Sequence, residues 1–281
     1  MPPNISIRAS MLPSYCDCPR RSACKIIPKI LEQAGFTVPQ RPNIVAAAIG
    51  TAVHQGEAEC MKAKLTIGAV CSENQATEAA MSNLDDSLKD EVQFDAKAPD
   101  RPTAEKQTIR LTQSYYIHAQ PRIQPAKIWN PKDPKDKISA DVKDGFTVTG
   151  HPDVQTVESA ISDLKTGVIL RPPHAQLGAY SLVSKSNSVD IQGVQSVFVP
   201  RVSIKKEQPM PLFSVYDLAY CEAEAWSIIE RVKADVQKFL ESGNPRVFLA
   251  NPMSMLCSEK FCPAIGMGKW CEFRKKAEEA A

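Results

Sequence analysis

GFTVTGHPDVQTVESAISDLKTG, residues 145–167, is the stretch that decides the expected fold. Its first half, FTVTGHPDVQTV, alternates in polarity and is rich in β-branched residues, which is typical of a strand. A short turn near Glu158 follows, and then a second apolar run, AISDL. We therefore expect a β-hairpin, with Asp153 on its first strand and Asp163 on its second.

This hairpin would bring two carboxylates and a lysine together. Neighbouring carboxylates repel each other unless a cation lies between them. A hard divalent ion such as Mg²⁺ or Mn²⁺ prefers oxygen ligands, so Asp153 and Asp163 are candidate metal ligands. Lys165 lies on the same side of the strand as Asp163, where it could position or deprotonate an attacking water. Leu164 would point into the core, and its carbonyl could ligate the ion.

The segments on either side of the hairpin predict helices and strands in alternation. Upstream, helices are expected within residues 10–31, over 43–65 and over 73–93, followed by a polar, proline-rich stretch at 97–143 with PKDPKDK as an exposed loop and residues 109–120 as either helix or strand. Downstream we expect a helix over 174–185, a strand over 191–202, and a long helix that opens at Ser214, with Asp217 in capping-box position and Gly243 as its end. This order predicts an α/β fold with a mixed central sheet flanked by helices.

The bulk composition is that of an ordinary globular protein. The net charge of +2, from 34 basic and 32 acidic residues, neither indicates nor excludes a nucleic-acid binder. No run of 18 apolar residues occurs, so we expect no membrane-spanning helix. The opening residues MPPNISIRAS lack the basic-then-apolar design of a signal peptide. A cytoplasmic protein is therefore expected.

Three short motifs in and after the hairpin carry a family resemblance. They are Gly-x-x-Asp ending at Asp153, Asp-x-Lys-Thr-Gly starting at Asp163, and Gln-x-x-x-Tyr from Gln176 to Tyr180. In this order they resemble the RecB-like branch of the PD-(D/E)XK nucleases, which includes CRISPR-associated RecB-like nucleases and many phage exonucleases. The resemblance implies a restriction-endonuclease-like core, with Gln176 contacting the substrate phosphate or holding Lys165, and Tyr180 supporting the DNA backbone.

An upstream helix extends the resemblance. Gly50-Thr51-Ala52-Val53-His54 matches the helical Gly-x-x-x-His of this branch, whose histidine ligates a metal that is usually manganese. An isolated helical histidine is more often structural, but this one comes in the right order before the acidic hairpin. The resemblance therefore implies that His54 is a metal ligand, which agrees with the preference of imidazole for Mn²⁺ over Mg²⁺. His151 is expected to be structural.

Nine cysteines are many for a cytoplasmic chain, where metal binding, catalysis or burial must account for them. A subset of the same branch holds a four-iron, four-sulfur cluster with one N-terminal and three C-terminal cysteines. The Cys-Pro-Arg-Arg step at Cys18 matches that subset and implies the ligands Cys18, Cys257, Cys262 and Cys271. The C-terminal spacing, with four and then eight intervening residues, is wider than the family's. Cys16 and Cys24 could compete, and a Cys₄ zinc site would use the same residues.

Together these features predict one RecB-like nuclease domain over residues 1–281. It would comprise a helical region with the histidine motif and a proline-rich insertion (32–143), a catalytic core (144–213) and a cysteine-rich clasp (244–281), with the N- and C-terminal segments joined at the cysteine metal site.

The predicted function is a metal-dependent DNA exonuclease that acts in phage recombination. A CRISPR adaptation nuclease is the alternative from the same branch. Expected partners are single-stranded DNA or duplex ends and a recombination or CRISPR-adaptation protein, with no membrane. A non-catalytic nucleic-acid-binding subunit is disfavoured because Asp153, Asp163 and Lys165 are intact. A zinc or redox protein with incidental hairpin charges would leave His54 unexplained.

Overall fold

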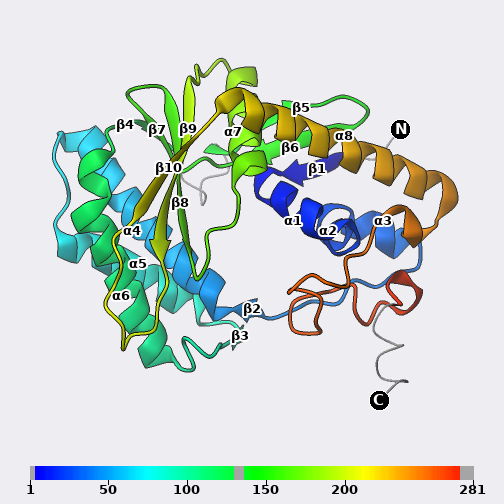
Figure 1. The fold of residues 1–281 in the computed structure, drawn as a ribbon, viewed down its shortest axis with the longest axis horizontal. Helices are drawn as coiled ribbons and strands as arrows, with labels where there is room; N and C mark the ends of the chain where they lie inside the picture. The colour runs from blue at the N-terminus through cyan, green and yellow to red at the C-terminus, as the bar shows by residue number, and fades with distance from the viewer. Residues whose placement is uncertain (1–3, 130–135, 273–281) are drawn as a thin grey trace.

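The computed structural model describes residues 4–129 and 136–272. Its strands are β1 (Ile5–Arg8), β2 (Asn43–Ile44), β3 (Val92–Gln93), β4 (Pro125–Ile128), β5 (Ile138–Asp141), β6 (Phe146–Gly150), β7 (Val154–Thr156), β8 (Ala160–Gly167), β9 (Gly193–Pro200) and β10 (Leu212–Tyr216). Its α-helices are α1 (Leu12–Asp17), α2 (Pro19–Ile26), α3 (Pro28–Gln33), α4 (Val45–Ile67), α5 (Glu73–Ser87), α6 (Arg101–His118), α7 (His174–Ser186) and α8 (Leu218–Ser242). The fold is the expected α/β architecture, with mixed sheets flanked by helices (Figure 1).

A five-stranded sheet organises the molecule, in the order β10-β9-β8-β7-β4. β8 and β9 run parallel, whereas the other neighbours are antiparallel, so the sheet is mixed as expected. Helices α4, α5 and α6 cover one side of this sheet, and α7 and α8 lie on the other side (Figure 1). The central strand β8 is therefore covered on both faces, which explains its nearly continuous burial from Ile161 to Leu164.

A second sheet has three strands in the order β1-β6-β5. The N-terminal strand β1 pairs in parallel with β6, and β5 pairs antiparallel with β6. β2 and β3 form a separate two-stranded ladder. Two hydrophobic cores follow from this arrangement. One joins the three-stranded sheet to α1–α3, α7 and α8, and the other joins α4–α6 to the five-stranded sheet.

The first strand of the expected hairpin is in fact two strands, so that part of the prediction is wrong. β6 belongs to the three-stranded sheet and β7 to the five-stranded sheet, and the chain crosses between them at residues 151–153. Asp153 therefore lies in the crossing and not on a strand. The β7–β8 hairpin itself is present, and Val154 pairs with Ser162. Its turn ends at Ser159, whose backbone has a left-handed φ of 58°.

Other element boundaries also differ from the predictions. Ser214 lies in β10, and the long helix begins only at Leu218, because the Asp217 carboxylate accepts the Tyr220 N–H at 2.6 Å as an N-cap. Its end at Gly243 is as expected, with a left-handed φ of 63°. The second upstream helix stops at Ser87. The ambiguous residues 109–120 are mostly helical, within α6, and the predicted PKDPKDK loop lies largely outside the described residues.

The chain after α8 packs against the N-terminal helices, as the expected joining of the two ends requires (Figure 1). The Arg20 N–H donates to the Leu249 carbonyl at 3.1 Å, and the Trp270 indole donates to the Arg20 carbonyl at 3.2 Å. Trp270 is fully buried and forms ring contacts with Phe36, Phe239 and Phe248. None of the described helices is long and apolar enough to cross a membrane.

Candidate active site

Helix α4 approaches β8 closely enough to bring its side chains to the acidic hairpin. A Cβ on Gly50 would lie only 2.9 Å from the Thr166 hydroxyl, so a side chain at this position would displace the helix or the threonine. His54 lies one turn further along the same helix. The glycine of the predicted Gly-x-x-x-His motif thus has a packing role, and it sets the distance between α4 and β8.

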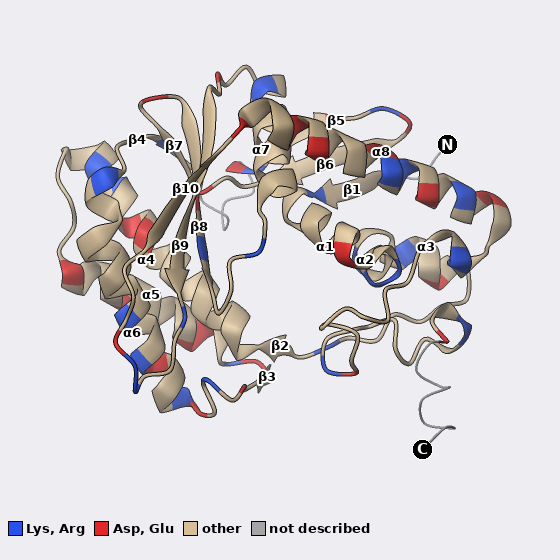
Figure 2. Cartoon of the chain, in the orientation of Figure 1, with Lys and Arg blue, Asp and Glu red and all other residues tan. Residues whose placement is uncertain are grey.

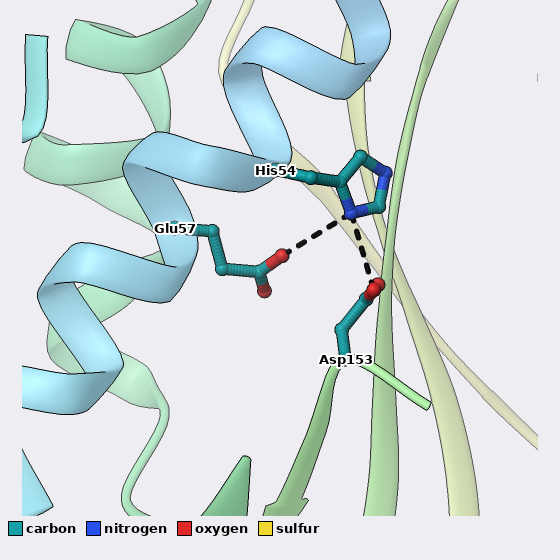
Figure 3. Close-up of side chains that lie close together, drawn as sticks. All are labelled: His54, Glu57 and Asp153. Atoms are coloured by element: carbon teal, nitrogen blue, oxygen red, sulfur yellow. Dashed lines mark hydrogen bonds and ion pairs between the residues drawn. The ribbon is translucent and has the colours of Figure 1, made fainter. Parts of the chain in front are cut away.

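His54, Glu57 and Asp153 form a compact group of potential metal ligands (Figure 3). One ligand atom from each lies within 4.8 Å of the others. His54 Nδ1 lies 3.2 Å from Asp153 Oδ1 and 3.6 Å from Glu57 Oε2. The other oxygen of Glu57 accepts a hydrogen bond from Tyr115 at 3.1 Å. Two carboxylates and one imidazole are a donor set that could hold a divalent metal ion.

The charges in this group are poorly compensated by protein alone. Burial would lower the pKa of His54, but the charge and hydrogen bond of Asp153 outweigh it and raise the pKa to about 9. Burial, and then the charge of Asp153, raise the pKa of Glu57 well above its usual value. A bound cation would offset the carboxylate repulsion that adds to the effect of burial in this second shift.

Asp163 and Lys165 face α7, on the opposite side of β8 from the buried Leu164. Lys165 Nζ is 2.5 Å from Asp163 Oδ2 and donates a hydrogen bond to Gln176 Oε1 at 3.0 Å. The Gln176 amide in turn donates to Tyr180 Oη at 2.8 Å. Because Gln176 and Tyr180 are one helical turn apart, α7 presents both to the strand. The lysine ammonium is therefore held between two partners.

The backbone joins the two groups. Asp153 and Asp163 each lie one residue beyond the Val154–Ser162 pair, at the open end of the β7–β8 hairpin. The Leu164 N–H donates to Asp153 Oδ2 at 2.8 Å, which fixes the second oxygen of this carboxylate. The Leu164 side chain is buried in the core, as expected. Asp163 stands outside the compact ligand group, so its predicted role as a metal ligand stays a prediction.

Glu57 was missed by the sequence reasoning. Its side chain is only 2% exposed. Glutamate is rarely buried in this way unless it has a partner, so the burial itself points to a role in the site. The signal that was available is its position three residues after His54, which places both on one face of a helix. His151, at the crossing between the two sheets, is half-buried and lies apart from the compact ligand group.

The four predicted cluster cysteines meet at one place. Cys18, Cys257, Cys262 and Cys271 all line a small cavity between α2 and the C-terminal segment, together with Arg20 and Arg21. The Asn251 N–H donates to Cys18 Sγ at 3.5 Å.

The two competing thiols differ in how far they lie from these cysteines, and burial and the nearby Cys262 raise the pKa of Cys24 to about 12. Cys16 is exposed on α1. Cys24 is buried, and its thiol contacts the Arg20 carbonyl and Met267 Sδ. Neither Cys16 nor Cys24 lines the cavity.

No family model matches the sequence, and no curated protein matches it. Among solved structures, a protein of Eubacterium rectale described as a presumed exonuclease aligns with a TM-score of 0.55 and 11% sequence identity. The alignment covers 90% of this chain and 86% of that one. The two chains share a fold. A second structure, SSO0001, aligns over 73% of this chain and 86% of that one at 11% identity, but its TM-score of 0.24 does not indicate a shared fold.

Replacing Gly150 by alanine is expected to destabilise the protein by about 1–3 kcal/mol, the usual cost of overpacking. The new Cβ would lie 2.7 Å from the Tyr180 ring, which is buried and cannot move without breaking its hydrogen bond to Gln176. Urea denaturation measures the loss. Gly193→Ala is the matched control, because its Cβ would meet only the Ala160 methyl at 3.4 Å. Equal midpoints for wild type and Gly150→Ala would contradict this packing argument.

Proposed function

We propose that this protein is a metal-dependent nuclease that hydrolyses phosphodiester bonds of DNA, and that it works as an exonuclease. The observation that carries the proposal is the convergence of His54, Asp153, Asp163 and Lys165, from three separate segments, on one end of the β7–β8 hairpin. The shared fold with a presumed exonuclease supports it. So does the sequence resemblance, which rests on the same residues.

In this proposal, one group of side chains binds the metal ion, and Lys165 stabilises charge at the phosphate. His54, Glu57 and Asp153 would hold Mn²⁺ or Mg²⁺, with Asp163 close enough to add its charge to the site. When bound, the ion would polarise the scissile phosphate and lower the pKa of a coordinated water. Lys165 would supply the positive charge beside the attacked phosphorus.

The gathering of these side chains argues against a non-catalytic binding subunit. Such a subunit would need a positive surface for the DNA backbone, but it would not need a lysine held against a buried carboxylate. Basic and acidic residues are interspersed along α8 and over α4–α6 (Figure 2), so no broad basic face is evident in this view. The DNA contact would then be local, around the hairpin.

The test of this proposal is a time course on end-labelled linear DNA, single-stranded and duplex, with Mg²⁺ or Mn²⁺. We expect progressive shortening from an end, no cleavage in excess chelator, and no cleavage of covalently closed circular DNA. The direction of shortening gives the polarity. Failure of the wild-type protein to cut any linear or single-stranded DNA would contradict the proposal, and cleavage of the closed circle would contradict the exonuclease part of it.

We further propose that Cys18, Cys257, Cys262 and Cys271 hold a four-iron, four-sulfur cluster. In the described chain, no three of these four sulfur atoms lie within 4.8 Å of one another. Zinc–sulfur bonds of about 2.3 Å would hold four sulfurs about 3.8 Å apart, so a larger cofactor fits better. Arg20 and Arg21 would offset the negative charge of four thiolates, and the Asn251 N–H would donate to a ligand sulfur.

Cys18→Ser is expected to lose most of the iron and to lower the melting temperature. The cluster would close a loop of more than two hundred residues, and a cross-link of that span is worth about 5 kcal/mol in the chain-entropy model. The measurement is iron and acid-labile sulfide per chain after anaerobic purification. Cys16→Ser is the matched control, since this exposed thiol two residues earlier lies outside the cavity. Zinc without iron in wild type would overturn the assignment.

A further inference from the structure

A second cavity lies beside the candidate active site, on the three-stranded sheet. Its volume is about 420 Å³. The residues that shape it come from the end of β1 and the turn after it, the residue before β5, the end of β6 and the crossing after it, and helix α7: Arg8, Ser10, Lys137, Thr149, His151 and Tyr180. A cavity of this size accommodates a small organic ligand such as one nucleotide. The site described above uses only Tyr180 of these residues.

The lining of this cavity is cationic. Arg8 and Lys137 take part in none of the ion pairs formed within the described chain, and no described carboxylate lines the cavity. His151 Nε2 is buried and has no hydrogen-bond partner among the described residues. The hydroxyls of Ser10 and Thr149 add two more potential donors. Such a set of donors matches an anion with several oxygens.

The cavity is joined to the candidate active site through Tyr180. This ring forms part of the cavity wall, and its hydroxyl accepts the hydrogen bond from Gln176, which also holds Lys165. The backbone gives a second connection, because Gly150 and His151 line the cavity and Asp153 follows directly in the same crossing. A nucleotide in the cavity would therefore lie next to the bond that is cut.

We propose that this cavity binds the terminal phosphate of the DNA strand that is being degraded. The inference rests on the proposed nuclease function and deepens it. An internal phosphodiester carries one negative charge and offers two unbridged oxygens. A terminal phosphomonoester carries up to two charges and offers three oxygens, which is the better match to an arginine, a lysine, a histidine and two hydroxyls.

The proposal is tested by binding, without cleavage. Fluorescence anisotropy with excess chelator compares labelled duplexes that are identical except for a 5′-phosphate, a 3′-phosphate or hydroxyl ends. We expect one phosphorylated end to bind at least tenfold more tightly than the hydroxyl end, as one or two charge-assisted hydrogen bonds would provide. The phosphorylated duplex that binds more tightly shows whether the cavity takes the 5′- or the 3′-phosphate.

Arg8→Gln and Lys137→Gln should each reduce that preference to less than threefold and leave the affinity for hydroxyl ends nearly unchanged. Lys238→Gln, an exposed lysine on α8, is the matched control and should keep the full preference. Equal binding of all three ends by wild type would overturn the inference, and so would variants that lose affinity for every end equally, which indicates an internal phosphate contact. A protein that binds none of the duplexes would count instead against the proposed function.

Discussion

Lys165→Ala is expected to slow cleavage of linear DNA by about a thousandfold, within the range of 10² to 10⁴ that a positioned proton-transfer or charge-stabilising group contributes. The affinity for DNA should change by less than threefold, because one cation at the reacting phosphate adds little to binding in the ground state. Single-turnover cleavage and anisotropy binding, measured on the same substrate, separate the two quantities.

The size of this effect follows from how the lysine is held. Its side chain is 26% exposed, and its ammonium contacts Asp163 on one side and Gln176 on the other. The long lysine chain is thus already ordered before substrate arrives, and little entropy remains to be lost at the reacting phosphate. Burial raises the pKa of Asp163, and the charge of Lys165 opposes that rise and favours the carboxylate.

Two controls make the result interpretable. Lys238→Ala removes an exposed lysine from α8 and should cleave at the wild-type rate. The urea midpoint of Lys165→Ala must stay near that of wild type, since an unfolded variant would also be inactive; if it does not, Lys165→Met keeps the aliphatic chain and removes only the charge. A folded Lys165 variant that cleaves at the wild-type rate would contradict the proposed role.

The parts of the fold that were predicted correctly are those whose pattern is local. The β7–β8 turn, the helix that carries His54 and the helix that carries Gln176 and Tyr180 each follow from periodicity and turn residues within a few positions. The hairpin pattern also predicted that the two aspartates lie on neighbouring strands. Asp163 lies on β8 as predicted, whereas Asp153 lies one residue before β7.

The errors occur where distant segments decide the structure. Residues 146–156 keep one alternating pattern although they serve two different sheets, because each sheet buries every second side chain. The crossing at residues 151–153 is imposed by pairing of β6 with β1, which lies about 140 residues earlier in the sequence. Residues 214–216 were assigned to the following helix because nothing in their own sequence indicates that they pair with β9.

Glu57 illustrates the same limit within the candidate site. On sequence alone it is one more polar residue on a long helix. Its burial depends on Tyr115, which lies 58 residues away and donates to it, and on Asp153 across the site. These contacts place Glu57 beside the proposed metal ligands. They lead to a prediction in which one substitution weakens metal binding and stabilises the metal-free protein.

Glu57→Gln should weaken Mn²⁺ binding by about 10- to 100-fold and should at the same time stabilise the metal-free protein. Glutamine keeps the shape of the side chain and an oxygen that can accept the Tyr115 hydrogen bond, but it removes a charge buried beside Asp153. Isothermal titration of the metal-free protein measures the affinity. Thermal melts with and without Mn²⁺ measure the stabilisation, which should fall by up to about 2.7 kcal/mol for a hundredfold loss of affinity.

Glu59→Gln is the matched control, because this residue lies on the same helix two positions later and therefore points away from His54. It should leave both the Mn²⁺ affinity and the melting temperature of the metal-free protein unchanged. If Glu57→Gln bound Mn²⁺ as tightly as wild type, Glu57 would be a structural partner of Tyr115 and His54, and the ion would have to be held by His54, Asp153 and Asp163. Because both variants change a glutamate to a glutamine on the same helix, a difference between them comes from the surroundings of the Glu57 side chain and not from the change of residue type.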